Sequence, residues 1–124
     1  MFESVDRQLA AETVGLSVEQ VEEIISQAVA GNASKRAQFV LKYILEHGAC
    51  TTSELEEAGY KHPPRAVRDL KDAGVDIETV RESYIDPVTG DNKRRGRYVL
   101  RGVKEASARR QLTKRFLDEV KATG

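Results

Sequence analysis

The first half of the chain repeats its hydrophobic residues at the intervals of one face of an α-helix. One such segment opens at Ser17 and ends at Gly31. Gln20 stands three residues after the serine, which is the spacing of a capping box. A shorter helix is expected from Phe2 to Glu12. In the segment that opens at Ser17, the apolar residues have the spacing of a helix that buries one side. These residues are Val18, Val21, Ile24, Ile25 and Ala28.

Two further helices follow in the middle of the chain. The first is predicted from Ser34 to His47. The second is short, from Thr52 to Ala58, and a capping box of Thr51 with Glu54 opens it. Gly59 closes the short helix. The inward positions of these two helices are apolar: Ala37, Val40, Leu41, Ile44, Leu55 and Ala58.

A third helix is predicted from Arg65 to Ala73, with Gly74 as its stop. The proline pair Pro63-Pro64 precedes it, and proline disfavours a helix before itself but fits the first helical turn. The helix has an apolar side for packing against the rest of the protein: Ala66, Val67 and Leu70.

Two strands come next, from Ile77 to Ile85 and from Arg95 to Arg101. Threonine, valine, tyrosine and isoleucine favour extended backbone there. The run from Asp86 to Asn92 between them is rich in turn-forming residues. We therefore expect a β-hairpin with a polar, flexible tip, across which Tyr84 and Tyr98 pair.

A last helix is predicted from Val103 to Lys121. Three helices, the last two tightly joined, followed by a hairpin are the order of a winged helix-turn-helix. The expected fold class is mainly α with a β-hairpin, namely a winged helix-turn-helix with helical extensions at both ends. We expect one compact domain made of an N-terminal helical extension (1–33), the winged helix-turn-helix (34–101) and a basic C-terminal helix (102–124).

Composition supports a globular chain. The 124 residues are 40% hydrophobic, enough for one domain with a core. A single cysteine, Cys50, excludes an internal disulfide framework and is expected to be a small packed thiol. No apolar run reaches the length of a membrane span, and no secretory signal is visible at the N-terminus. The sequence thus predicts a soluble cytoplasmic protein without a membrane partner.

Charge is distributed unevenly along a chain whose formal net charge is zero. Residues 1–62 hold ten acidic and five basic residues, and residues 63–124 hold ten acidic and fifteen basic ones. Ten of the basic residues lie between Lys93 and Arg115, with Glu105 as the one acid among them. Such a concentrated positive field is typical of a protein that binds a polyanion.

The predicted helix at residues 65–73 presents polar side chains opposite its apolar side: Arg65, Arg68, Asp69 and Asp72. Arginine suits the two acceptors on guanine in the major groove, and aspartate can accept a hydrogen bond from the amine of cytosine. The same residues also stand at the spacing of surface ion pairs, Arg65 with Asp69 and Arg68 with Asp72. Both interpretations stay open at this point.

Two further groups of residues are candidates for contact with phosphate. Lys61, His62 and the free amides at the helix start can hold a phosphate, although His62 is equally suited to capping the helix. The hairpin can follow the backbone or enter the minor groove, or be a solvated loop. Its basic residues are Lys93, Arg94, Arg95, Arg97 and Arg101.

The stretch SELEEAGYKHPPRAVRDLKDAGVDIET, from Ser53 to Thr79, resembles the winged-helix domains attached to some bacterial restriction endonucleases. The resemblance lies in a glycine followed by an aromatic or polar residue, an HPPRA-x-RD helix start, a second glycine and an extended IET-like strand. It implies a DNA-reading or DNA-scanning role in a restriction system. It carries over no catalytic residue.

Catalysis by this chain is not expected. A nuclease needs carboxylates that bind a metal, or a histidine-rich site around a phosphate, and the chain has two histidines in unrelated settings. Asp86, Asp91 and Lys93 faintly resemble the acids and lysine of a nuclease but lie in one predicted turn. No Gly-rich phosphate loop and no Cys/His metal spacing is visible. We therefore expect no cofactor, no metal and a nuclease domain or subunit elsewhere.

Two alternatives of other classes remain. A transcription regulator would use the same module to bind an operator as a dimer through the last helix. A winged helix for protein–protein contact would dock its basic stripe on an acidic partner. Binding to double-stranded DNA is the function that the sequence favours.

Overall fold

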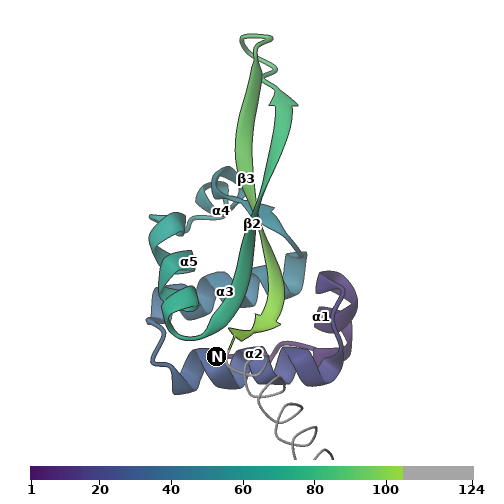
Figure 1. The fold of residues 1–124 in the computed structure, drawn as a ribbon, viewed down its shortest axis with the longest axis vertical. Coiled ribbons are helices and arrows are strands. Elements are labelled where there is room, and N and C mark those ends of the chain that lie inside the picture. The colour runs from purple at the N-terminus through teal and green to yellow at the C-terminus, as the bar shows by residue number, and fades with distance from the viewer. Residues whose placement is uncertain (105–124) are drawn as a thin grey trace, which may run out of the picture.

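The computed structural model describes residues 1–104 (Figure 1). This part of the chain contains five helices and one three-stranded sheet. The elements follow in the order α1 (Arg7–Val14), α2 (Val18–Ala30), α3 (Lys35–His47), β1 (Cys50–Thr51), α4 (Thr52–Glu57), α5 (Pro63–Asp72), β2 (Val75–Ile85) and β3 (Asn92–Val103). This arrangement confirms the predicted fold class of mainly α structure with a β-hairpin.

The first two helices begin at capping residues. The backbone N–H of Leu9 donates to the Asp6 carboxylate at 3.0 Å, so α1 starts after Asp6. The prediction of a helix from Phe2 was wrong, because Asp6 caps the helix and the residues before it form a turn in which Val5 N donates to Phe2 O at 3.0 Å. The capping box of α2 is confirmed, since Gln20 N donates to Ser17 Oγ at 3.1 Å and Ser17 N donates to Gln20 Oε1 at 3.0 Å.

The next three helices follow the predicted boundaries with two corrections. Glu54 N donates to Thr51 Oγ1 at 3.2 Å, which fixes the start of α4. That helix ends at Glu57, and Ala58 is exposed instead of pointing inward. The third predicted helix, α5, starts at Pro63, two residues earlier than expected, because both prolines fit its first turn.

The strands are longer than predicted and form a sheet in the order β1-β3-β2. Strand β1 was missed because it is only two residues long and carries no alternating signal. Val103 pairs with Val75 as the last residue of β3, so the expected helix does not start there. The remainder of that predicted helix lies outside the described residues.

The predicted pairing of Tyr84 with Tyr98 is wrong. Tyr84 pairs with Lys93 and Tyr98 pairs with Thr79, because the register places the two tyrosines on opposite faces of the hairpin. Tyr98 is buried, and its hydroxyl lies 2.9 Å from that of Thr52. It therefore belongs to the joint between the hairpin and α4.

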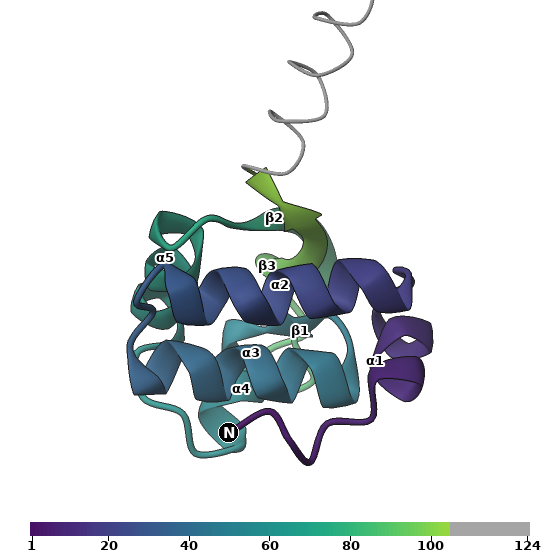
Figure 2. The same ribbon diagram turned by 90° about the horizontal axis from the view of Figure 1, so that it is seen from below.

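One buried apolar cluster joins all the helices to the inner half of the hairpin. Figure 1 and Figure 2 show α2 and α3 side by side below the hairpin, with α5 and α1 at opposite ends. Cys50 is buried, and this burial raises the pKa of its thiol to about 12, as fits a packed, unreactive group. The largest apolar side chains of the cluster include Ile24, Leu41, Ile44, Leu45, Leu55 and Leu70.

The outer half of the hairpin extends beyond the helices (Figure 1). Asp86 organises its tip, because its carboxylate accepts from Val88 N at 2.8 Å and its carbonyl accepts from Gly90 N at 2.7 Å. Beside the polar residues of the tip, two apolar side chains are exposed, since Ile85 and Val88 are 72% and 90% exposed. No helix within residues 1–104 combines the length and the hydrophobicity needed to cross a membrane.

Candidate nucleic-acid interface

The outward face of α5 borders an open hollow of about 1040 Å³ next to the start of α3. Ala66, Val67 and Leu70 are buried on the opposite face, so packing fixes which residues point outward. Arg65 and Arg68 are exposed in the hollow. The full lining consists of Ser34, Arg36, Pro64, Arg65, Ala66, Arg68, Asp69 and Asp72.

The two arginines of α5 are not held in ion pairs. Within residues 1–104, neither Arg65 nor Arg68 has a carboxylate within 4.0 Å, although Asp69 and Asp72 stand at helical spacing from them. No ion pair within 4.0 Å joins these four residues in the described part of the chain, although the charge of Arg65 contributes to the lowered pKa of the Asp69 carboxyl. Both guanidinium groups keep their donors free for a ligand.

Asp69 has a structural contact that the sequence did not indicate. Its Oδ2 atom accepts a hydrogen bond from Ser34 N at 2.8 Å. Hydrogen bonding to Ser34 is the main cause of the lowered pKa of the Asp69 carboxyl. Asp69 thus ties α5 to the first turn of α3, whereas Asp72 is exposed.

The first turn of α5 has no free backbone amide for a phosphate. The carbonyl of His62 accepts from Arg65 N at 3.1 Å and from Ala66 N at 3.3 Å, and prolines 63 and 64 carry no N–H. The predicted amide site was wrong for these two reasons. His62 occupies the N-cap position in a left-handed conformation, φ 53°, and its side chain makes no capping hydrogen bond. The side chains of Lys61 and His62 are both exposed.

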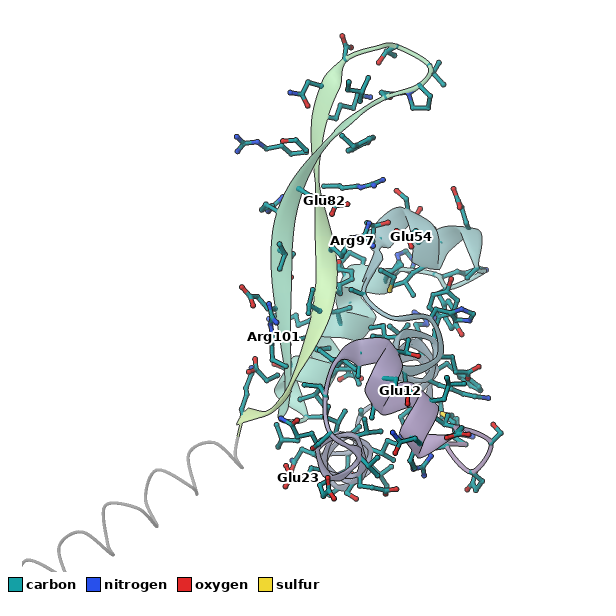
Figure 3. All side chains as sticks on the ribbon, turned by 90° about the vertical axis from the view of Figure 1, so that its right-hand side faces the viewer. Glu12, Glu23, Glu54, Glu82, Arg97 and Arg101 are labelled. Carbon is teal, nitrogen blue, oxygen red and sulfur yellow. The ribbon has the colours of Figure 1, made fainter. Side chains whose placement is uncertain are left out.

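Two of the predicted wing residues are used within the hairpin (Figure 3). Glu82 on β2 accepts from Arg95 Nε at 2.7 Å and from Arg97 Nε and Nη2 at 3.0 and 2.9 Å. Hydrogen bonds from Arg97 and then from Arg95 lower the pKa of the Glu82 carboxyl to about 2. Arg97 also donates to the Ala49 carbonyl at 3.0 Å and lies 3.3 Å from the Glu54 carboxylate. Arg97 therefore joins the hairpin to the start of α4.

Two more wing residues are paired with acids. Lys93 Nζ lies 2.8 Å from Asp86 Oδ2 at the tip, and Arg101 Nη2 lies 2.8 Å from Glu78 Oε2 near the base. Arg94 is the member of the predicted wing set that has no ion pair or hydrogen bond within the described part of the chain. The wing thus presents far less free positive charge than its sequence suggests.

Two basic residues outside the prediction lie beside the predicted ones. Arg81 shares a face of the hairpin with Arg94, since Arg81 pairs with Gly96 and Ser83 pairs with Arg94. Arg36 lines the hollow at α5. A helix dipole disfavours a cation in the first turn, so the position of Lys35 and Arg36 at the start of α3 is a signal of function that is visible in the sequence.

Among residues 1–104, no group of three His, Cys, Asp or Glu side chains is placed to hold a metal ion. Asp86 and Lys93 form the ion pair that closes the hairpin tip.

A family model described as a winged helix-turn-helix domain matches residues 36–103, which run from α3 to the end of β3. No curated protein and no solved structure matches the chain.

Proposed function

Because the chain belongs to the winged helix-turn-helix domain family, we propose that it binds double-stranded DNA with α5 in the major groove. The observation that carries this proposal is the pair of exposed guanidinium groups of Arg65 and Arg68 on α5, neither of which forms an ion pair within residues 1–104. They point away from a buried apolar face, so the helix can approach DNA without unpacking.

Each arginine of α5 has the geometry for a specific base contact. A guanidinium group can donate two hydrogen bonds to O6 and N7 of guanine, and such a pair is worth about 1–3 kcal/mol of discrimination. Asp72 is exposed and can accept from a cytosine amine. The Asp69 carboxylate is bound to Ser34 N, so its role is to hold α5 against α3.

The hairpin is proposed to follow the DNA backbone through a small part of its basic set. Arg94 and Arg81 are exposed on one face of the outer hairpin and make no ion pair there. Lys93, Arg95 and Arg97 instead set the shape and the position of the wing through Asp86 and Glu82. The last predicted wing contact, Arg101, is paired with Glu78 and becomes available only if phosphate replaces that carboxylate.

The test is a pair of titrations, one on a duplex selected from a random pool and one on random DNA. Arg65→Ala and Arg68→Ala should each reduce discrimination between the duplexes by about 1–3 kcal/mol while random binding changes less. Lys42→Ala is the matched control, because Lys42 lies in the second half of α3 and is paired with Glu46, not with a residue of α5. Equal losses on both duplexes would mean that α5 only clamps phosphates.

We also propose that the domain serves as a sequence-recognition part of a restriction endonuclease in the cytoplasm. This context rests on the resemblance of residues 53–79 to winged-helix domains of such enzymes. In this role the chain itself is not catalytic, and a nuclease domain or subunit supplies cleavage. A footprint on the selected duplex checks the context, because a palindromic footprint occupied by two copies would favour an operator-binding regulator instead.

A further inference from the structure

A second, smaller hollow of about 280 Å³ lies between the first turns of α3 and the turn that joins α4 to α5. We call it the α3 notch. It differs from the hollow at α5 in that no acidic residue lines it. Its lining consists of Arg36, Phe39, Gly59, Tyr60 and Lys61.

The α3 notch combines free positive charge with an exposed aromatic ring. Arg36 and Lys61 have no ion pair or hydrogen bond within residues 1–104. Phe39 is 46% exposed on α3, although the neighbouring Val40 is fully buried. Two unpaired cations and an apolar surface in one concave site are suited to a ligand with both an anionic and an apolar part.

The walls of the notch are held in place without a ligand. Gly59 adopts φ 99°, a conformation open to glycine but strained for other residues, and its N–H donates to Glu56 O at 3.0 Å. Tyr60 N donates to Leu55 O at 3.0 Å. The Tyr60 ring packs edge-on against Tyr43 with centroids 5.6 Å apart. Lys61 therefore extends from a fixed turn, which lowers the cost of ordering the site on binding.

Arg36 lines both the α3 notch and the hollow at α5. The two hollows are thus neighbours, and a duplex seated on α5 brings one of its strands across Arg36. We propose that the α3 notch binds one sugar-phosphate unit of that strand, with Arg36 and Lys61 on the phosphate and the Phe39 ring against the deoxyribose. This inference rests on the proposed function, since it needs DNA on α5.

The experiment measures affinity for a random duplex at several salt concentrations for Arg36→Ala, Lys61→Ala and Phe39→Ala. Each neutralised phosphate contact changes the slope of log K against log salt by about 0.9. Arg36→Ala and Lys61→Ala should each flatten the slope, and the double variant should flatten it by about 0.9 in total, because both side chains contact the same phosphate. Phe39→Ala should lower affinity several-fold and leave the slope unchanged, because it removes an apolar contact and no charge.

Val29→Ala is the matched control for Phe39→Ala, since Val29 is an apolar residue of α2 that is 53% exposed. A second readout uses duplexes with single neutral methylphosphonate linkages. One such linkage should weaken the wild-type protein but leave the double variant Arg36→Ala/Lys61→Ala unaffected, because that variant has already lost both contacts to the phosphate.

The outcomes separate this inference from the proposed function. Reduced discrimination in Arg65→Ala and Arg68→Ala, together with unchanged binding in all three notch variants, would overturn the notch and leave the proposed function standing. No binding of any duplex by the wild-type protein would overturn the proposed function. Notch variants that keep full DNA affinity but lose an acidic protein partner would show that the notch serves protein contact, against this inference.

Discussion

Replacing Glu82 with glutamine should strengthen DNA binding, although the change adds no positive residue. Glu82 accepts hydrogen bonds from both Arg95 and Arg97, and its charge compensates theirs. Glutamine keeps an oxygen at nearly the same place, so the hairpin geometry is preserved while the negative charge is removed. The wing then presents more uncompensated positive charge to phosphate.

The size of the effect follows from which arginine is freed. Arg97 stays bound to the Ala49 carbonyl and to Glu54 after the change, whereas Arg95 has Glu82 as its ion-pair partner and otherwise stacks on Tyr84 at 4.5 Å. We therefore expect one new phosphate contact, which steepens the log–log salt slope by about 0.9. Between about 50 mM and about 200 mM salt, the advantage of Glu82→Gln over wild type should shrink about 3.5-fold.

The assay is fluorescence anisotropy of a labelled random duplex at several salt concentrations. Glu46→Gln serves as the matched control, because it removes the carboxylate that pairs with Lys42 on α3, away from the wing. A thermal melt of each variant checks that the hairpin is retained. An unchanged or weaker affinity of Glu82→Gln, with a normal melt, would show that Arg95 does not reach the DNA and would refute the reasoning.

Three further predictions concern stability. Ile24→Ala should lower the free energy of unfolding by about 2–5 kcal/mol in a denaturant titration, since Ile24 is fully buried. A loss as small as that of the exposed Val29→Ala would show that α2 is not part of the core. His62→Gly should raise the free energy of unfolding by up to about 1 kcal/mol, because glycine relieves the strain of the left-handed conformation at a smaller cost in backbone entropy. A clear loss of stability in the same titration would show that the imidazole stabilises the turn. Glu82 has a pKa of about 2 against an ordinary 4.5. Its carboxylate therefore stabilises the fold above about pH 4.5, and this contribution is lost as pH falls toward 2. The melting temperature of Glu82→Gln should therefore depend less on pH than that of the wild type between those two values.

The helices could be predicted because their signals are local. Capping residues such as Ser17 and Thr51 and the apolar spacing of α3 and α5 each depend on neighbours within four residues. Strand β1 could not be predicted, since two residues become a strand only by pairing with Arg97 and Tyr98 far along the chain. The exposure of Ala58 was missed for a related reason, because α4 is too short for periodicity to define its buried side.

The candidate site was harder to predict because its chemistry depends on the register of the hairpin. The sequence shows the basic residues of the wing, but only the pairing of β2 with β3 reveals that Glu82 lies between Arg95 and Arg97. The same pairing brings Arg81 beside Arg94. On α5, Asp69 looked like a base-reading residue until its bond to Ser34 N tied it to α3.

These contacts divide the basic residues of the domain between two tasks. A cation that is already paired, such as Arg97, must give up a carboxylate before it can bind phosphate, so it contributes little net affinity but fixes the angle of the wing. An exposed cation with no ion pair in the described part of the chain, such as Arg68 or Arg94, keeps its donors for a ligand at no such cost. Net charge along the sequence therefore overstates the wing as a DNA-binding element. The free cations instead favour α5 and the neighbouring start of α3 as the centre of the interface, with the wing as a positioned support.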